Sequence, residues 1–444
     1  MRNSGTAPRL FWATVIVVAA IGYVQHNVRA WRGGQDDFRQ FYVAAQITSG
    51  QRPGPLYFPF RQRGVESCTD RVCPYVYPYS PLVALAVTPL AHWQQPTAAA
   101  VWFGINQLFT VLAFLALLLP WRHALTLPRL AVLLIVFANF APVTRQHAVG
   151  NITSLQLLLA ATALALLLDA RDLVAGSALG LLVLIKPFWL LFAPFFAVAR
   201  RPWAFAGMLL ALPAGFLATY TALGPAAIGL WNDWITWVLP SYATLVWLGN
   251  NQALAALVAR LAHLTPDIAL APLWLRAIQL AITVGITLAS VLWLQHVELR
   301  RRNDPYTVAG AFGFTLSAAL MTSSLLWLHY FMLLLLPITA LLVQMFERPV
   351  SAGFVVCVAA ATFVLARPGI RHPDLHLLTL GLLAIWMVSG WALRPRADVT
   401  LPRFWEKGRD SHTCAQVFAQ HARQATSRNE TGIAREIRTG RRAI

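Results

Sequence analysis

The sequence predicts an all-α polytopic membrane protein, and three observations support that prediction. The chain has 444 residues, of which 58% are hydrophobic and 12% are charged, whereas about a quarter of the residues of a soluble domain are charged. Apolar runs of about 17–25 residues, the length that a helix needs to cross a bilayer, recur along the chain. Many of these runs are apolar on every side, which argues against a soluble helical core.

The apolar runs predict a bundle of about 11–12 transmembrane segments. Two long polar and aromatic regions, 27–96 and 223–270, interrupt them. No internal repeat is visible, so an inverted-repeat transporter receives no support. The expected segments lie at 10–26, 97–120, 128–144, 152–168, 173–199, 203–222, 271–295, 306–325, 328–346, 350–366 and 376–393.

Lysines and arginines set the expected orientation, because short cytoplasmic loops are enriched in both. The first segment follows Arg2 and Arg9, and no small-residue cleavage site stands out after it. We therefore interpret it as an uncleaved first helix with a cytoplasmic N-terminus, rather than as a signal peptide. The region 27–96 then lies outside, and Arg122 and Arg129 lie inside.

The segment 173–199 decides the orientation of everything that follows it. If it crosses once, the arginines at 200–201 and 300–302 all lie outside, against the charge rule. If it turns back at Lys186 and Pro187, they all lie inside. Proline disfavours helix at the residue before it and removes a backbone donor. The charges therefore favour a re-entrant hairpin with Lys186 at its tip over a single kinked span.

With this hairpin, residues 1–394 form one membrane domain. Both long regions, 27–96 and 223–270, lie at the outer face. The tail, residues 395–444, is Arg-rich and has little apolar content, so we expect it to be cytoplasmic and disordered.

Two stretches within the outer regions predict helices that lie at headgroup depth. Ser80 to Trp93 is too short to span a bilayer and is broken by Pro89. Gly224 to Leu264 is rich in tryptophan, a residue enriched at membrane interfaces.

The net charge of +18 does not indicate nucleic-acid binding. The basic residues lie between apolar segments and in the tail, where cytoplasmic charges belong on a membrane protein. The sequence contains no soluble domain with a basic patch interleaved with aromatic residues, so we expect no nucleic-acid partner.

Two of the four cysteines, Cys68 and Cys73, stand close together in the first outer region. No histidine or second cysteine pair accompanies them, so a zinc site is not expected. In an oxidising compartment they can form a local disulfide, and two free thiols are the alternative.

The polar residues that could support chemistry gather at the outer face. Asp37 could act as a general base, or could be a solvated loop charge or a helix cap. An ammonium group in the membrane is costly and is usually functional, so Lys186 could meet a lipid phosphate; the alternative is a side chain that snorkels to the interface. His329 at a span end could also be an interfacial hydrogen-bonding residue. The acids form no convincing metal constellation.

A resemblance to a known family follows from several motifs in order. "DFRQFYVAAQITSG", "PLYFP" and "YPYSPLVALAVTPLAHW" are similar to the N-terminal signature of glycosyltransferase family 87. "GNITSLQLLLAATALALLL" and "AGSALGLLVLIKPFWLLFAPFFAVARRPW" resemble its middle section, and "GNNQALAALVARL" and "LWLHYFMLLLLPITALL" its later section. The resemblance extends from Asp37 to Pro337. Tyr79 departs from it, because the family often has proline there.

The resemblance implies a glycosyltransferase-C-type fold and assigns roles to residues that match the motifs. Asp37, rather than Asp36, would act at the acceptor hydroxyl, with His329 near the reaction centre. Lys186 would face the phosphate of the lipid-linked donor. The expected substrate-binding residues are Asn251, Gln252, Tyr57, Tyr77 and Asn151.

The expected function is transfer of mannose from a polyprenyl-phosphate donor to a glycolipid or polysaccharide acceptor. The expected place is the outer face of a bacterial cytoplasmic membrane, with both termini in the cytoplasm. No cofactor is required, because phosphate is a good leaving group, although a divalent metal is not excluded. The alternatives are a lipid-sugar flippase or transporter without catalysis, and an arabinofuranosyl transferase of the same superfamily.

Overall fold

The computed structural model describes residues 6–57, 77–241, 251–261, 271–298, 304–366 and 377–394, and every regular element in these ranges is helical. All of them belong to one contact unit, Met1–Arg394. Among the described residues, five helices are long and apolar enough to cross a membrane: Pro8–Trp31, Gln95–Trp121, Pro202–Leu223, Arg276–Val297 and Leu328–Glu347. The predicted class, an all-α polytopic membrane protein, is confirmed.

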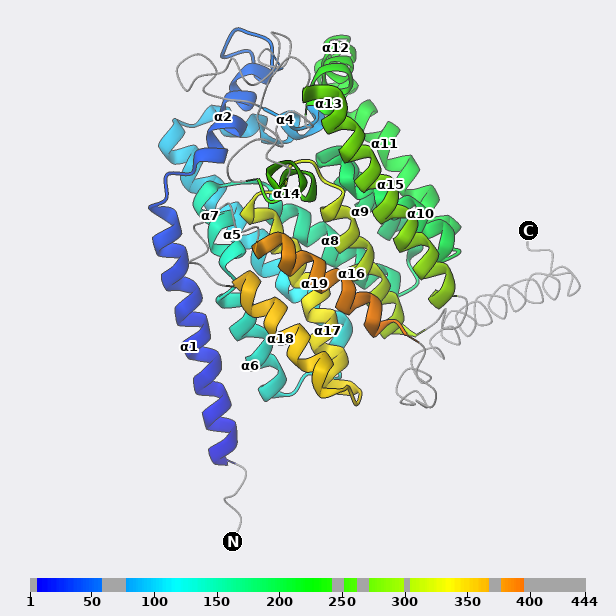
Figure 1. Cartoon of the computed structure of the whole chain (residues 1–444). Helices are drawn as coiled ribbons and strands as arrows, with labels where there is room; N and C mark the ends of the chain where they lie inside the picture. The colour runs from blue at the N-terminus through cyan, green and yellow to red at the C-terminus, as the bar shows by residue number, and fades with distance from the viewer. Residues whose placement is uncertain are drawn as a thin grey trace, which may run out of the picture. The chain divides into compact units, whose positions relative to one another are not determined.

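The helices follow one another closely along the chain (Figure 1). Those before the second long region are α1 (Thr6–Trp31), α2 (Asp36–Thr48), α4 (Pro81–Val87), η2 (Thr88–His92), α5 (Gln95–Leu118), η3 (Leu119–Trp121), α6 (Leu127–Ala138), α7 (Ala141–Val149), α8 (Thr153–Leu168), α9 (Asp172–Ile185), η4 (Pro187–Leu191), α10 (Phe192–Val198) and α11 (Pro202–Leu223). Those that follow are α12 (Ala226–Asp233), the π-helix η5 (Trp234–Val238), α13 (Leu239–Ser241), α14 (Leu254–Leu261), α15 (Ala271–Glu298), α16 (Pro305–Met321), η7 (Leu328–Leu334), α17 (Leu335–Glu347), α18 (Ala352–Ala366) and α19 (Leu377–Ala392).

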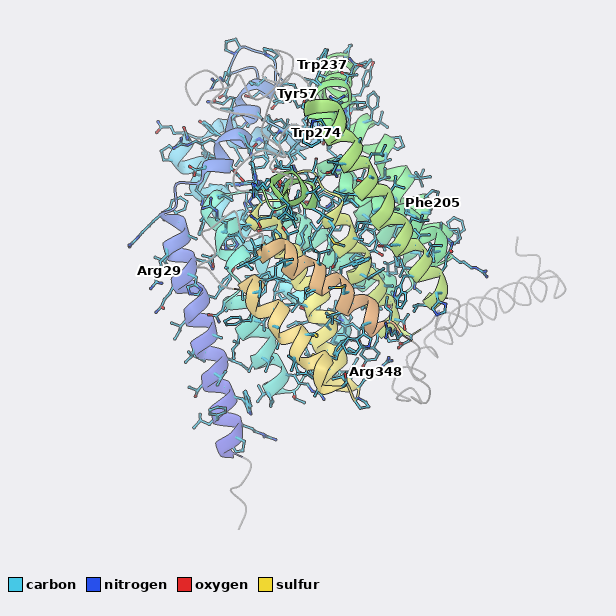
Figure 2. The ribbon with its side chains drawn as sticks, viewed as in Figure 1. Arg29, Tyr57, Phe205, Trp237, Trp274 and Arg348 are labelled. Atoms are coloured by element: carbon cyan, nitrogen blue, oxygen red, sulfur yellow. The ribbon has the colours of Figure 1, made fainter. Side chains whose placement is uncertain are left out.

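The two ends of the bundle differ in chemistry. At the end where α1 begins, arginines pair with acids that cap or terminate helices. Arg348 bonds Asp304, the N-cap of α16, at 2.8 Å, and Arg129 pairs with Glu347 at the end of α17. The short helices α2, α4 and α12 gather at the opposite end (Figure 1). Figure 2 shows Tyr57 near that end and Arg348 away from it.

The chain reverses at Lys186, which confirms the expected hairpin. α9 ends there because Lys186 is extended, with φ −147° and ψ 120°, and Pro187 opens η4. Arg201 Nη1 lies 2.6 Å from Asp172 Oδ1, so the start of α11 meets the start of α9. The 3₁₀ turn and α10 between them therefore bring the chain back to the side from which α9 began.

The expected span at 128–144 is instead a bent pair, because α6 and α7 meet at 46°. The helix stops at Asn139, whose side-chain amide donates to the carbonyl of Ile135, and Pro142 lies in the first turn of α7. Both residues favour a break, since a proline is tolerated where a helix begins and not within it. The bend turns α7 toward the residues around Asp37.

The regions expected at headgroup depth contain short helices. α4 begins after Ser80 and continues into η2. The tryptophan-rich region forms α12 and the π-helix η5, and Trp234 Nε1 donates to the carbonyl of Pro78 at 3.3 Å. That bond joins the two long polar and aromatic regions to each other.

Close packing between α9 and α11 fixes one leg of the hairpin. A β-carbon on Gly176 would overlap the carbonyl oxygen of Ala204, and one on Gly180 would lie 2.6 Å from Ala211 Cβ. Only glycine permits two helix backbones to approach this closely. The order of these contacts along both helices shows that α9 and α11 run parallel.

We expect Gly176→Ala to lower the free energy of unfolding by about 1–3 kcal/mol, because the added methyl group overpacks the α9–α11 contact. Gly104→Ala in α5 is the matched control, since nothing lies within 4 Å of its β-carbon position; it should leave stability unchanged or raise it by up to about 1 kcal/mol. Tryptophan fluorescence during thermal unfolding in detergent measures both. Equal stability of the two variants would contradict the close contact.

Candidate active site

The site is built around the first turn of α2. Gly34 and Gln35 form the turn that precedes it, and Gln35 adopts a left-handed conformation with φ 53° and ψ 47°. Phe38 and Phe41 are buried against the bundle, and the ring of Phe41 lies 5.3 Å from that of Trp102. This buried aromatic face fixes the rotation of α2, so the side chain of Asp37 faces inward and is only 16% exposed.

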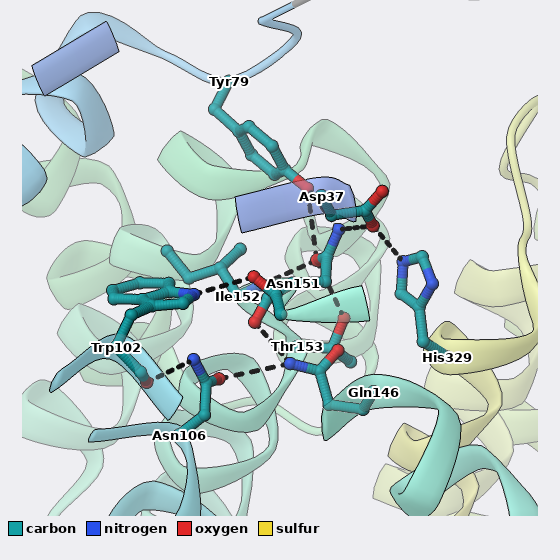
Figure 3. Close-up of polar contacts among 10 residues, drawn as sticks. Asp37, Tyr79, Trp102, Asn106, Gln146, Asn151, Ile152, Thr153 and His329 are labelled. Atoms are coloured by element: carbon teal, nitrogen blue, oxygen red, sulfur yellow. Dashed lines mark hydrogen bonds and ion pairs between the residues drawn. The ribbon is translucent and has the colours of Figure 1, made fainter. Parts of the chain in front are cut away.

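Asn151 holds the carboxylate of Asp37. Its Nδ2 donates to Asp37 Oδ2 at 2.8 Å and to the Tyr79 hydroxyl at 2.9 Å (Figure 3). Its Oδ1 accepts from the backbone amide of Ile152 at 2.7 Å and from the Thr153 hydroxyl at 3.2 Å. The amide is therefore fixed at both ends, and its orientation presents a donor to Asp37.

His329 approaches Asp37 from the start of η7. Its Nε2 lies 3.9 Å from Asp37 Oδ2, a separation longer than a hydrogen bond (Figure 3). The side chain is 2% exposed, and Nε2 is buried with no hydrogen-bond partner among the described residues. The ring lies tilted against that of Tyr330, with centroids 4.3 Å apart. The geometry directs this nitrogen toward the same carboxylate oxygen that Asn151 binds.

Lys186 lies between two tyrosine rings. Its Nζ is 4.6 Å from the ring centroid of Tyr79 and 5.4 Å from that of Tyr330. Such contacts with aromatic faces stabilise a desolvated ammonium group. Because Tyr79 also bonds Asn151, one tyrosine links the lysine to the partner of Asp37.

The carboxyl group of Asp37 is basic for an aspartate. Its pKa is raised from 3.8 to about 6, chiefly by burial and to a smaller extent by the nearby charge of Asp36. The hydrogen bond from Asn151 and the charges of Arg145 and Lys186 oppose this rise in pKa. A carboxylate with a pKa near 6 is ionised at neutral pH and is a stronger proton acceptor than an exposed aspartate.

Tyr57 and Tyr77, two of the expected substrate-binding residues, pack behind Tyr79. The Tyr57 hydroxyl donates to the Tyr79 carbonyl at 2.7 Å, and the ring of Tyr77 lies 5.7 Å from that of Tyr79. Both side chains are buried, with 1% and 2% exposure. Both are placed to support the ring of Tyr79.

The amide of Asn251 is engaged with backbone groups near His329. Its Nδ2 donates to the carbonyl of Ser324 at 2.8 Å, and its Oδ1 accepts from the amide of Leu326 at 2.9 Å. The backbone amide of Gln252 donates to the carbonyl of Leu326 at 2.7 Å. These bonds fix the segment that leads into η7, so the geometry favours a supporting role for Asn251 over direct contact with a sugar.

The structure thus brings together Asp37, Asn151, Lys186 and His329, which lie far apart in the sequence. Cys68 and Cys73, the expected disulfide, lie outside the described residues. In the described part of the chain no three His, Cys, Asp or Glu side chains form a group that could hold a metal ion.

Sequence reasoning gave no role to Tyr79, Tyr330 or Arg145. Tyr79 departs from the family's usual proline, which was a usable signal, since a tyrosine adds a hydroxyl and a ring where proline has neither. Arg145 belongs to the polar run "TRQH" that follows the third apolar segment. A polar run of this kind at a span end indicates a buried or functional surface.

Comparison with known proteins gives one match. The model of glycosyltransferase family 87 matches residues 77–324, more than half of the chain. Lys186 and Asn151 lie within the matched residues, whereas Asp37 and His329 lie outside them. No curated protein and no solved structure matches the chain.

We expect Asp37→Asn to stabilise the protein. The pKa of Asp37 is higher in the folded protein than its ordinary value of 3.8, so the folded state binds this proton more tightly than the unfolded chain does. Ionisation of the carboxylate therefore lowers the free energy of unfolding. This loss is absent below about pH 4 and complete above about pH 6. At about pH 8 the variant should exceed wild type by about 2–3 kcal/mol in the free energy of unfolding.

Thermal unfolding in detergent at both pH values measures this difference. Asp36→Asn is the control, because Asp36 is exposed and its charge is solvated. If Asp37→Asn is no more stable than Asp36→Asn at about pH 8, the carboxylate is not desolvated as described.

Proposed function

Because this chain belongs to glycosyltransferase family 87, we propose that it transfers mannose from a polyprenyl-phosphate donor to a hydroxyl group of a glycolipid or polysaccharide. It is a multi-pass membrane glycosyltransferase. The observation that supports the finer proposal best is the Asp37 carboxylate. This group is partly desolvated and bound by Asn151, and it shares the site with a histidine and a buried lysine.

In this mechanism Asp37 is the general base. As the acceptor oxygen attacks the anomeric carbon, its proton moves to the carboxylate of Asp37. The bond between that carbon and the phosphate oxygen breaks, and the oxygen leaves with the electron pair on the lipid phosphate. The pKa of about 6 supports this role, because the base is ionised at neutral pH and still attracts a proton.

Lys186 and His329 act on the charges that develop. The ammonium of Lys186 faces the donor phosphate and stabilises the negative charge that it gains on departure. His329 Nε2, 3.9 Å from Asp37 Oδ2, forms a hydrogen bond with the acceptor or with the leaving phosphate. Asn151 orients the base and is not required to touch the sugar.

The proposed orientation puts this site on the outer side of a bacterial cytoplasmic membrane. The arginine pairs lie at the opposite end of the bundle, and positive charge is typical of the cytoplasmic side. The short helices α2, α4 and α12 then lie at the outer interface, with tryptophans such as Trp237 exposed. Residues 395–444 form a cytoplasmic tail in this proposal.

Asp37→Asn tests the assignment of the base. We expect it to reduce transfer by about 10²–10⁴-fold, the usual contribution of general base catalysis. Asp36→Asn, one residue away and exposed, should retain activity within about threefold. Protein reconstituted in vesicles is incubated with radiolabelled polyprenyl-phosphate-mannose and candidate acceptors, and labelled product is counted.

Full activity of Asp37→Asn would remove Asp37 from the mechanism. Movement of the labelled lipid across the vesicle membrane without any transfer would instead identify a carrier. Varying the donor sugar in the same assay distinguishes mannose from arabinofuranose.

Lys186→Met tests the phosphate contact. Methionine keeps most of the side-chain volume but removes the charge, so we expect the KM for the lipid donor to rise about tenfold or more. The KM for the acceptor is the internal control and should change by less than about twofold. An unchanged donor KM would argue against a role for Lys186 at the phosphate.

A further inference from the structure

A buried histidine outside the mechanism ties four helices together. His147 on α7 is completely buried, and both ring nitrogens are engaged. Its Nδ1 contacts Asn27 Oδ1 on α1, and its Nε2 lies 2.9 Å from Thr110 Oγ1 on α5. The Thr110 hydroxyl also bonds Ser154 on α8 at 3.0 Å. One imidazole therefore fixes α7 to its neighbours on two sides.

The surrounding bonds assign one tautomer to the ring. Asn27 Oδ1 already accepts from Gln107 Nε2 at 3.0 Å, and Asn27 Nδ2 donates to the carbonyl of Tyr23. An amide oxygen only accepts, so His147 Nδ1 carries the proton and Nε2 is left as an acceptor. It lies 2.9 Å from the Thr110 hydroxyl, whose single proton also has the carbonyl of Asn106 within reach at 2.8 Å. Such a buried hydrogen-bond network specifies one arrangement of its helices.

The backbone of α7 next to this histidine holds the turn before α2. The carbonyl of His147 accepts from Gln35 Nε2, and the carbonyl of Ala148 accepts from the amide of Gln35 at 3.2 Å. Gly150 closes α7 in a left-handed conformation, with φ 70°, and a β-carbon there would overlap Gln35 Oε1. Gln35 is two residues before Asp37, so α7 sets where α2 begins.

The same helix also holds the partner of the base. Gln146 Nε2 donates to the carbonyl of Asn151, and Asn151 donates to Asp37. Both ends of the Asp37–Asn151 bond are thus attached to residues 146–150. Because α7 is bent by 46° from α6, a continuous helix does not fix its direction, and the His147 network does.

We propose that His147 is a positioning residue for glycosyl transfer, which holds α7 so that Asp37 and Asn151 keep their hydrogen-bonded geometry. This inference rests on the proposed role of Asp37. A displacement of a reacting group by about 1 Å can cost about 10²-fold in rate, so loss of the network should lower turnover more than binding.

Two isosteric substitutions test it. Thr110→Val removes the hydroxyl that bonds His147, whereas Thr219→Val removes an equally buried hydroxyl that bonds only Gly215 within its own helix. We expect Thr110→Val to lower kcat about tenfold while the donor KM changes by less than about twofold. Thr219→Val should match wild type.

The pH dependence of kcat/KM distinguishes a positioning role from a purely structural role, because a purely structural role would leave it unchanged. The Asn151 hydrogen bond lowers the pKa of Asp37, so a loosened bond raises this pKa. The acid limb of kcat/KM for Thr110→Val should therefore lie at higher pH than that of wild type. His147→Asn, which keeps a donor toward Asn27, should retain more activity than His147→Phe.

Hydrogen exchange of the peptide that contains residues 33–41 tests positioning without any assay of activity. Exchange should be faster in Thr110→Val than in Thr219→Val, because the turn at Gln35 is released. If Thr110→Val and His147→Phe match Thr219→Val in kcat, acid limb and exchange, the inference is overturned. If wild type transfers no sugar, the proposed function fails, and exchange alone decides whether His147 positions α2.

Discussion

The hydrogen bond from Asn151 to Asp37 is the interaction on which the rest of the site depends. It joins two segments 114 residues apart, the start of α2 and the loop between α7 and α8. Burial raises the pKa of the carboxylate, and the hydrogen bond from Asn151 is the largest of the effects that oppose this rise. The hydroxyl of Tyr79 accepts a hydrogen bond from Asn151, and its ring lies against the ammonium of Lys186. One tyrosine therefore supports both the base and the buried cation.

Features controlled by charge and hydropathy could be predicted from the sequence. The reversal at Lys186 was predicted from two arginine clusters about a hundred residues apart, at 200–201 and 300–302, because both must lie on the cytoplasmic side of the membrane. The importance of Asp37 over Asp36 came from motif resemblance, and their different exposure gives it a physical reason. The two adjacent carboxylates of α2 lie in different environments. Asp37 is turned toward the bundle, and Asp36 is exposed.

Features controlled by packing between distant segments could not be predicted. The amide of Asn251 bonds backbone groups of Ser324 and Leu326, which lie 73 and 75 residues further along the chain. The break between α6 and α7 lies inside a run that hydropathy treats as one span, and Asn139 and Pro142 together favour it. Hydrogen-bond partners of this kind depend on which distant segments meet in the fold. The pattern of residue types along a single sequence does not show this.

The reversal at Lys186 also constrains how the protein reaches its membrane. A half-length helix pair with a lysine and an unwound backbone at its tip is unstable in lipid, where each unsatisfied polar group costs several kcal/mol. The tip is covered here by protein, with Trp189 fully buried and bonded to Gln156 of α8. The hairpin therefore cannot settle as an independent unit during insertion. Helices made later complete its cover, since the ring of Phe312 on α16 lies 4.6 Å from that of Phe192.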